Sequence, residues 1–488
     1  MPRVLIPLLL VGAIVLGAAW HDNEGSAIAA AGPAPKQARP NVIVIETDDQ
    51  TAETLRVMKN VKALLGAQGA TFENNFVTFP LCCPSRATLL TGQYAHNHGV
   101  LGNSPPAGGY EKLDHSNTLA VWLQRAGYHT AHLGKYLNGY GKRGKELEIP
   151  PGWSEWHGAV KLTFFDHQLN ENGKLVSFGS RPADYQTDVY GSKAREIIKR
   201  RAPGTKPFFL WLAFYAPHGG GPPDSDDPKG MGTTKPAPRH QNDFATEPLP
   251  APPSLNERDV SDKPAGIRSR PLLSAQDLAA VREAYQQQLE SLLAVDEAVA
   301  GVVAQLKQAG ELSNTLIVFT ADNGFFHGEH RVPSGKVLLY EPSIRVPLLM
   351  RGPGVPKGVR VQQLVANIDL APTIVDAANA KPGRAMDGRS LLPLVKNRRI
   401  AWRSELLLER GPASGAARRN ARDQRYAALR TTRYLYAEYE NGERELYDLA
   451  QDPHQLQSRH ADPGLASTRG ELAQRLARLS SCAGQSCR

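Results

Sequence analysis

The chain has 488 residues, of which 41% are hydrophobic and 22% are charged. These proportions are ordinary for a globular protein, and the length favours one large domain with a smaller one over a single core. The formal net charge of +9 suits anionic ligands, although a generally solvated basic surface explains it equally well. The sequence contains neither a basic helix nor an aromatic-basic RNA-binding motif, so a nucleic-acid-binding protein is not expected.

The first residues have the pattern of an export signal. Met1-Pro2-Arg3 gives a positively charged start, and an uncharged, largely apolar run follows from Val4 to Trp20. Alanine-rich stretches near and after the end of this run supply cleavage sites. We therefore predict a signal peptide over residues 1–31, a Pro/Ala-rich linker over 32–39, and a secreted or extracytoplasmic protein. The run is slightly short for a spanning helix, so no stable membrane span is expected, but an uncleaved anchor stays open.

Residues 82–92 read Cys-Cys-Pro-Ser-Arg-Ala-Thr-Leu-Leu-Thr-Gly and form the most informative stretch of the chain. Proline fits the first turn of a helix, because its missing N–H would be unpaired there and its fixed φ angle suits a helix start. We therefore predict that Pro84 opens a helix and that Cys82 lies just before it. The free N–H groups at such a helix start favour an oxyanion beside residue 82, and Arg86 adds a permanent cation. For a bare Cys-x-Pro, two inert buried thiols or a vicinal disulfide would be the simpler interpretation.

The whole pattern, C-x-P-S-R-x-x-x-L-T-G, resembles the signature of the sulfatase family. In that family the first cysteine is oxidised during biosynthesis to formylglycine, an aldehyde that hydrates to a geminal diol, and the match assigns this role to Cys82. The resemblance implies a formylglycine-generating enzyme as a partner during maturation. It also implies an α/β, alkaline-phosphatase-like fold, with a large, mixed, mostly parallel sheet flanked by helices.

Polar side chains follow two predicted buried strands. Asn41–Ile45 leads into Asp48-Asp49, and Thr315–Phe319 leads into Asp322-Asn323. Open α/β sheets bind ligands at the carboxyl ends of their strands, and adjacent carboxylates repel each other unless a cation lies between them. Asp-Asp alone is equally consistent with helix capping, but three carboxylates and an amide suit Ca²⁺ or Mg²⁺. The resemblance favours one Ca²⁺ and implies these ligands: Asp48, Asp49, Cys82, Asp322 and Asn323.

A lysine follows the strand predicted at Thr130–Leu133. Sulfatases commonly have Gly-Lys-aromatic-His at this place, where the lysine bridges nucleophile and sulfate and the histidine assists. Lys135 matches the lysine, whereas Leu137 departs from the pattern and leaves the histidine's role unfilled. The run Lys-Tyr-Leu-Asn that begins at Lys135 resembles the glucosamine-6-sulfatase branch of the family, which points to amino-sugar sulfates.

Two further positions complete the predicted active site. His218 follows the strand predicted at Pro207–Phe214 and matches the family's Pro-His, which contacts sulfate and the leaving group. A strand-end imidazole can donate a proton to a leaving oxygen near neutral pH. Lys336 matches the family's sulfate-binding lysine. The resemblance therefore implies this catalytic set: Cys82, Arg86, Lys135, His218 and Lys336.

The remaining segments set the domain organisation. We expect the long Gly/Pro-rich stretch at 219–271 to frame the substrate pocket. Ser274 and Asp277 predict a capping box for a helix that ends at Gly310, and a strand is predicted at 344–350.

Asn441-Gly442 predicts a hairpin in a small antiparallel sheet. An amphipathic helix around 472–479 precedes Cys482 and Cys487, for which a small disulfide loop is favoured over metal binding. The predicted domains are a catalytic domain over 40–395 and a C-terminal α+β subdomain over 396–488.

The motifs occur in family order from about residue 40 to 460, which is more specific than any one of them. They predict a sulfuric ester hydrolase that removes sulfate from a sulfated sugar or an aryl sulfate through a formylglycine hydrate and one divalent cation. Two alternatives stay open. One is a phosphonate or phosphate ester hydrolase of the same superfamily, and the other is a non-catalytic sulfoglycan-binding protein, if Cys82 is unmodified.

Overall fold

The structure is a computed structural model that describes residues 39–488 except 143, 203, 205, 221–222, 224–226 and 412–423. The predicted signal peptide at 1–31, and the predicted linker apart from residue 39, lie outside the described residues. Among the helices of the described part of the chain, none has the length and apolar character needed to cross a membrane. Residues 39–488 form one compact unit.

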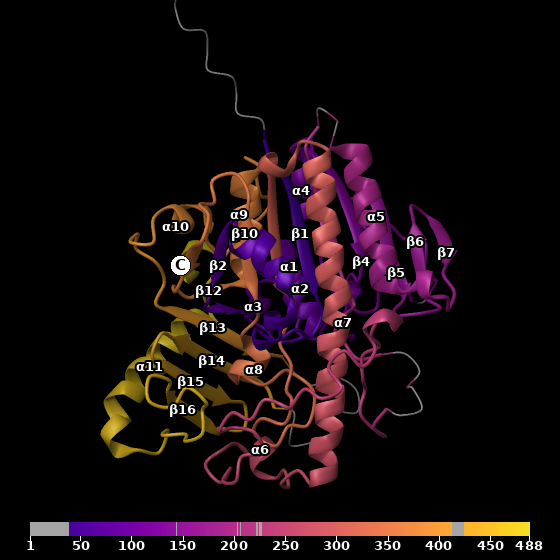
Figure 1. Cartoon of the computed structure of the whole chain (residues 1–488). Helices are drawn as coiled ribbons and strands as arrows, with labels where there is room; N and C mark the ends of the chain where they lie inside the picture. The colour runs from indigo at the N-terminus through magenta and orange to yellow at the C-terminus, as the bar shows by residue number, and fades with distance from the viewer. Residues whose placement is uncertain are drawn as a thin grey trace, which may run out of the picture. The chain divides into compact units, whose positions relative to one another are not determined.

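Within the described residues, ten strands form one mixed sheet in the order β11-β2-β10-β9-β1-β8-β4-β5-β6-β7 (Figure 1). Strands β9, β1, β8, β4 and β5 at its centre run parallel to one another, and the antiparallel strands β10 and β6 flank them. The bounds are β1 Asn41–Thr47, β2 Ala70–Phe72, β4 His129–Gly134, β5 Glu155–Lys161, β6 Gln168–Glu171, β7 Lys174–Ser177, β8 Phe208–Ala213, β9 Thr315–Ala321, β10 Leu348–Arg351 and β11 Val359–Val361. Strands β3 Asn75–Phe76 and β12 Val365–Ala366 pair separately.

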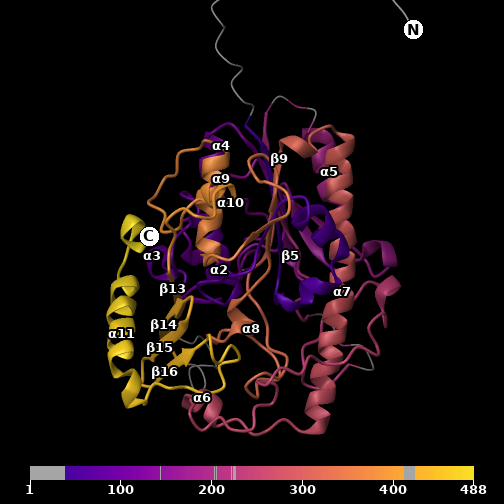
Figure 2. The ribbon, with the colours of Figure 1, turned by 60° about the vertical axis from the view of Figure 1, so that its left-hand side comes forward.

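Both faces of the main sheet are covered. Every residue of β1 is buried, and alternate side chains enter two different cores: Val42 and Val44 face one, Ile43 and Ile45 the other. This explains why the strand is apolar at each of the four positions from Val42 to Ile45 rather than at every second one. Figure 2 shows α5 and α7 on one face and α2, α4 and α9 on the other. The predicted α/β class, with a mixed and mostly parallel sheet, is confirmed.

The helices have the following bounds: α1 Lys59–Val61, α2 Cys82–Thr91, α3 Ala95–His98, α4 Leu119–Arg125, α5 Gln186–Arg201, α6 Ala265–Arg268, α7 Ala275–Gln308, α8 Glu341–Ile344, α9 Leu370–Ala377, α10 Leu392–Lys396 and α11 Ala466–Ser480. The capping box predicted for α7 is present, with Ser274 and Asp277 bonded to each other's backbone N–H. Helix α2 begins at Cys82, so the prediction that Cys82 precedes the helix is wrong. Pro84 is the third helical residue, where its N–H would still have no helical partner.

The strand predicted at 344–350 is wrong in its first half. Residues Glu341–Ile344 form the short helix α8, and β10 begins only at Leu348. Pro342 suits the first turn of α8. Pro347 cannot donate to a strand ladder, so pairing starts after it.

The C-terminal region contains a second, antiparallel sheet in the order β13-β14-β15-β16. Its strands are β13 Glu405–Arg410, β14 Tyr426–Thr431, β15 Tyr434–Tyr439 and β16 Arg444–Asp448. The predicted hairpin at Asn441-Gly442 is confirmed, with Gly442 at φ 87° in its turn. Helix α11 buries its predicted apolar face, and Cys482 and Cys487 form a disulfide. The division into domains at residue 396 stays a prediction.

Candidate active site

The predicted metal ligands lie side by side because their strands are neighbours in register. Thr47 at the end of β1 pairs with Ala321 at the end of β9, so the next residues of both strands emerge at the same edge of the sheet. The backbone N–H of Asp49 donates to Oδ1 of Asp322 at 3.2 Å, and Nδ2 of Asn323 donates to Oδ1 of Asp49 at 2.6 Å. The pairing of β1 with β9 therefore brings Asp48, Asp49, Asp322 and Asn323 together.

Two further strand ends add basic groups to the same edge. Gly134 of β4 pairs with Ala213 of β8, and the residues that follow are Lys135 on one strand and the segment up to His218 on the other. The Lys135 ammonium contacts Oδ2 of Asp48. Nε2 of His218 lies 3.6 Å from Oδ2 of Asp49.

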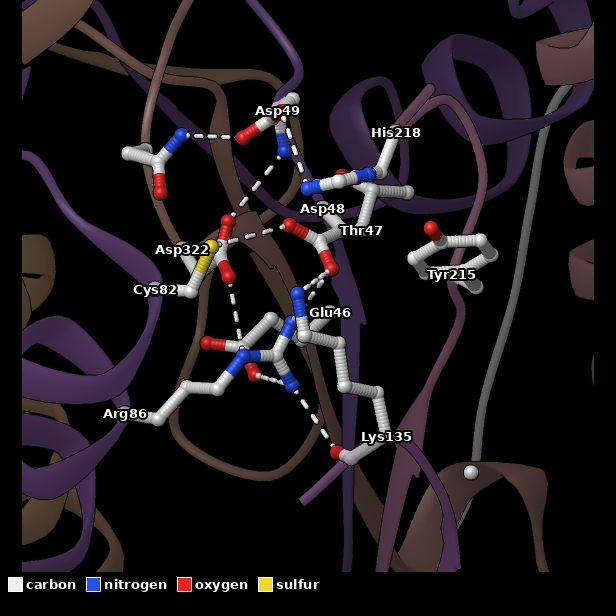
Figure 3. A network of polar contacts seen from close by, with 12 residues as sticks. Glu46, Thr47, Asp48, Asp49, Cys82, Arg86, Lys135, Tyr215, His218 and Asp322 are labelled. Carbon is white, nitrogen blue, oxygen red and sulfur yellow. Dashed lines mark hydrogen bonds and ion pairs between the residues drawn. The ribbon is translucent and has the colours of Figure 1, made fainter. Parts of the chain in front are cut away.

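The first residue of α2 faces this group (Figure 3). The Cys82 thiol donates to Oδ1 of Asp48 at 3.5 Å, and Nζ of Lys336 lies 3.0 Å from the Cys82 sulfur. Lys336 also contacts Oδ1 of Asp49. One candidate ligand atom from each of Asp48, Asp49, Cys82 and His218 lies within 4.8 Å of the others.

Arg86 lies beneath the cluster and is completely buried. Its Nε donates to Oδ2 of Asp322 at 2.8 Å, one of its terminal nitrogens donates to the carbonyl of Lys135 at 2.9 Å, and the other lies 3.7 Å from Oδ2 of Asp48. The guanidinium thus holds two of the carboxylates in a fixed relation. All nine positions predicted from the sequence converge on one site.

The residues fit one divalent cation. The carboxylates of Asp48, Asp49 and Asp322 are buried within a few ångströms of each other, which is costly unless cations balance them. Oδ1 of Asn323 is buried and has no hydrogen-bond partner among the described residues. An unpaired amide oxygen beside three carboxylates is a hard, oxygen-only donor set of the kind that Ca²⁺ and Mg²⁺ take.

Comparison with known proteins decides the family. Residues 40–380 match the sulfatase family, and residues 328–482 match the C-terminal region of N-sulphoglucosamine sulphohydrolase. This chain belongs to the sulfatase family. It is a sulfuric ester hydrolase, and its family generally uses formylglycine and a divalent metal.

Three relatives of this sulfatase are informative. N-acetylglucosamine-6-sulfatase of Capra hircus is 33% identical over 95% of this chain and 87% of its own length. A putative extracellular sulfatase Sulf-1 homolog of Caenorhabditis elegans is 36% identical over 76% of this chain and 52% of its own length. A solved structure of BT4656 in complex with its substrate D-glucosamine-2-N,6-O-disulfate has a TM-score of 0.75 and 25% identity, and the match covers 90% of this chain and 97% of that one.

The sulfatase site contains a charged residue that the sequence reasoning missed. Glu46 is the sixth residue of β1 and is 1% exposed. Its Oε2 lies 3.2 Å from a terminal nitrogen of Arg86 and accepts a hydrogen bond of 3.2 Å from the Trp211 indole. Burial raises the pKa of Glu46 to about 7 against the attraction of Arg86. A glutamate directly after the apolar run Val42–Ile45, two residues before Asp48, was the signal that could have found it.

Tyr215 was also missed. Its ring stacks on His218 with centroids 4.9 Å apart, and the Lys135 ammonium lies 5.7 Å from the same ring. The tyrosine therefore touches two predicted catalytic groups. Leu137, at the family's histidine position, is buried in the apolar core beside Tyr136 and Tyr140, so it brings no polar group to the site.

The electrostatics of the site keep its lysines charged and its thiol neutral. Burial alone would lower the pKa of Lys135, but the Asp48 carboxylate outweighs burial and holds the pKa above its usual value. The Asp49 carboxylate likewise outweighs the effect of burial and raises the pKa of Lys336. Burial, with the nearby Asp48 charge, raises the pKa of the Cys82 thiol to about 12. An unmodified Cys82 would thus be a poor nucleophile, since the thiolate is the reactive form.

Proposed function

We propose that this sulfatase removes the 6-O-sulfate of a glucosamine-type sugar outside the cytoplasm, using formylglycine at residue 82 and one Ca²⁺. The amino-sugar assignment rests on the relatives named N-acetylglucosamine-6-sulfatase and on BT4656 with its disulfated glucosamine. The use of Ca²⁺ rather than Mg²⁺ rests on family resemblance. Conversion of Cys82 would require a formylglycine-generating enzyme during maturation.

One observation carries the proposal: four oxygen-bearing side chains from two strands surround the side chain of residue 82. Asp48 lies 3.5 Å from its sulfur, and Asp49, Asp322 and Asn323 are joined to one another by hydrogen bonds. Three cationic side chains complete the site: Arg86, Lys135 and Lys336. A sulfate monoester carries negative charge, and fixed cations in a buried site stabilise that charge as it shifts toward the leaving oxygen.

The bound cation would neutralise charge on the sulfate oxygens and lower the pKa of the attacking hydroxyl. The hydrated formylglycine would supply two hydroxyl groups, one to attack sulfur and one whose proton loss expels sulfate and restores the aldehyde. A serine has one hydroxyl and could not complete the second step. Lys336, 3.0 Å from the Cys82 sulfur, and Lys135 would hold the sulfate against that nucleophile.

His218 would protonate the departing alcohol. Its Nδ1 lies 2.5 Å from the carbonyl of Gly219, which can only accept, so Nδ1 carries a proton and Nε2 is the atom that faces the site. The side chain is 28% exposed, more than the 2% of Asp49 beside it, so a leaving alcohol could reach its imidazole from solvent. Burial lowers the pKa of His218, and the carboxylates of Asp49 and Asp48 offset only part of this effect. Once Nε2 has taken up a second proton beside these carboxylates, transfer of that proton to an alkoxide is therefore favourable.

We assign the protein to the secreted or extracytoplasmic space, with the signal peptide at 1–31 or, alternatively, an uncleaved anchor there. The disulfide between Cys482 and Cys487 supports an oxidising compartment. The C. elegans relative described as extracellular supports the same placement.

Mass spectrometry of the peptide that contains residue 82, combined with assays on glucosamine-6-sulfate, an aryl sulfate and an aryl phosphate, tests the proposal. The expected result is formylglycine at residue 82 and a preference for the sugar sulfate. Preference for the phosphate ester would favour the phosphohydrolase alternative. An intact thiol in active, natively produced protein would end the formylglycine mechanism.

A further inference from the structure

The starts of the parallel strands form an edge of the main sheet that lies opposite the candidate active site. Strands β1, β4, β8 and β9 run parallel to one another, so their first residues lie at one edge and the metal-ligand cluster at the other. Helices α4, α5 and α7 end at the first of these edges, shortly before β4, β8 and β9 begin (Figure 1). The seven residues of β1 separate the two edges by about 20 Å.

We call residues 39–40, 125–128, 199–202, 206–207 and 307–314 the amino edge. These segments contain seven Lys or Arg residues and one acidic residue, Glu311. The Glu311 carboxylate accepts hydrogen bonds from the amides of Asn41 and Asn314. Arg200 and Arg201 pair with the buried Glu155 at the start of β5. The other five cations are exposed and take part in no ion pair among the described residues: Arg39, Arg125, Lys199, Lys206 and Lys307.

The ends of helices account for only part of this charge. Arg125, Lys199 and Lys307 lie in the last turns of α4, α5 and α7, where a cation complements the negative end of the helix dipole. Arg39 and Lys206 lie outside the helices, each two residues before the first residue of a strand. Stabilisation of helix ends therefore does not explain why exposed cations from loops gather at the same edge.

The amino edge is also where the chain continues toward its N-terminus. The uncharged, largely apolar run Val4–Trp20 is joined to Arg39 by residues 21–38. Eighteen residues reach at most about 60 Å when fully extended. An apolar run retained in a membrane would therefore keep the domain near the lipid surface, with the amino edge as its point of attachment, and would raise the local concentration of the domain there.

We propose that the amino edge docks on an anionic lipid surface. The inference goes beyond the proposed reaction and does not depend on it. Exposed cations without acidic partners attract negatively charged headgroups, and docking through this edge directs the active site away from the bilayer, toward substrate in solution. A sulfated glycan has the same sign of charge, but only a membrane also accounts for an apolar run joined to this edge.

Cosedimentation with lipid vesicles tests the docking on the natively produced, mature protein. One vesicle type is phosphatidylcholine alone, and the other contains equal parts of phosphatidylcholine and phosphatidylglycerol. An apolar run retained in the protein adds to binding of both types, so the ratio of the two affinities reports the effect of charge.

Two variants, each with four substitutions, are compared with the wild type. The edge variant combines Arg125→Gln, Lys199→Gln, Lys206→Gln and Lys307→Gln. The matched control combines four exposed lysines outside the amino edge, Lys59→Gln, Lys112→Gln, Lys161→Gln and Lys229→Gln. Both variants lose the same formal charge, so a difference between them reports where the charge lies.

The wild type should prefer the vesicles with phosphatidylglycerol, and higher ionic strength should remove this preference. Each cation near an anionic membrane adds about fivefold in affinity, so the edge variant should bind these vesicles at least about fiftyfold more weakly, and the control less than about threefold. Equal binding of both vesicle types by the wild type, or equal losses in the two variants, would overturn the inference. Loss of heparin binding in the edge variant, without a vesicle preference in the wild type, would instead make the amino edge a glycan surface.

Turnover of a soluble aryl sulfate distinguishes failure of this inference from failure of the proposed function. None of the four altered residues belongs to the candidate active site, so the edge variant should keep the kcat and the melting temperature of the wild type. A vesicle preference in a protein that hydrolyses no sulfate ester would retain the docking surface and reject the proposed reaction. Hydrolysis without a vesicle preference would do the reverse.

Discussion

Glu46 and Arg86 form an ion pair of 3.2 Å in the interior of the protein, and Glu46 lies two residues before Asp48 in the chain. Arg86 also bonds Asp322 and lies near Asp48, so one guanidinium joins three carboxylates. Glu46 is the member of this network that does not line the site. Arg86 and Trp211 hold the Glu46 carboxyl group in position. The negative charge of Glu46 in turn limits how far the Arg86 guanidinium can move toward the metal ligands.

Glu46→Gln should lower both stability and turnover. The amide keeps the shape and an acceptor for Trp211 but removes the negative charge that Glu46 carries opposite Arg86 above its pKa of about 7. We expect a loss of about 1–3 kcal/mol in the free energy of unfolding, typical of a charged buried hydrogen bond, and a lower kcat with a smaller change in KM. Urea denaturation and steady-state kinetics measure these two effects. Glu297→Gln, which breaks a surface pair with Arg239, is the control and should change stability by less than about 1 kcal/mol. Unchanged kcat in Glu46→Gln would show that Arg86 needs no such partner.

Tyr426→Phe should slow turnover through Lys336. The Tyr426 hydroxyl donates at 3.0 Å to the carbonyl of Val337, whose N–H donates to the carbonyl of Pro80 at 3.1 Å. Val337 has a φ of 78°, which is strained for a β-branched residue and persists only if its surroundings hold it. Without the hydroxyl, the segment can relax and move Lys336 away from Asp49. We expect a fall of about threefold to tenfold in kcat.

Tyr436→Phe is the matched control for this prediction. It removes a hydroxyl from the same sheet, but that hydroxyl donates to Glu438, away from Val337. Equal kcat values for the two variants would mean that the C-terminal sheet does not position Lys336.

Removal of divalent cations should abolish activity and lower the melting temperature together. Three buried carboxylates lie within the site, and their repulsion rises when the cation between them is lost. In the range above its dissociation constant, each tenfold increase in free Ca²⁺ should add about 1.4 kcal/mol to stability. Calorimetry in chelator, followed by titration with Ca²⁺ or Mg²⁺, measures this and ranks the two ions. Full activity and an unchanged melting temperature in chelator would exclude a structural or catalytic cation.

The free energy of unfolding should fall in mild acid because of a charge cluster around Glu155, the first residue of β5. Burial alone would raise the pKa of Glu155, but hydrogen bonds from His129, His157 and Arg200 outweigh it and hold the pKa well below the usual range. A carboxyl group with a depressed folded-state pKa contributes stability above its unfolded pKa, near 4.3. That contribution decreases as pH falls toward the folded-state value.

The test compares wild type and Glu155→Gln in urea at several pH values. The wild-type advantage should be complete at pH 6 and should shrink steadily below about pH 4.5. The active site lies elsewhere, so kcat of the folded variant should be unchanged. An advantage independent of pH would assign the effect to packing rather than charge.

The elements that the sequence predicted correctly are those determined by a short segment of the chain. Continuous apolar runs predicted β1 and β9, and the capping pair Ser274 and Asp277 predicted the start of α7. The carboxyl ends of neighbouring parallel strands meet at one edge of the sheet. This rule predicted that the metal ligands after β1 and β9 lie together. Motif resemblance supplied Lys135, His218 and Lys336, whose residue types alone are unspecific.

The features that the sequence did not predict depend on contacts between residues that are far apart in the chain. Trp211, a partner of Glu46, is 165 residues away, so no window of sequence contains the pair. The strand predicted at 344–350 begins only at Leu348, because α8 extends to Ile344 and Pro347 cannot join the ladder, which an apolar run does not reveal. His327 received no role from the sequence, since its imidazole contacts Gln288 of α7, which lies 39 residues away in the chain.

The central claim is that side chains from two strands and residue 82 surround one divalent ion. A crystal structure of the mature, natively produced protein, with anomalous diffraction data collected to identify the ion, tests it most directly. The expected result is a single ion bound by Asp48, Asp49, Asp322 and Asn323, with oxygen rather than sulfur on the side chain of residue 82. A site without an ion in protein that turns over sulfate esters, or an ion bound elsewhere with an intact thiol at residue 82, would contradict it.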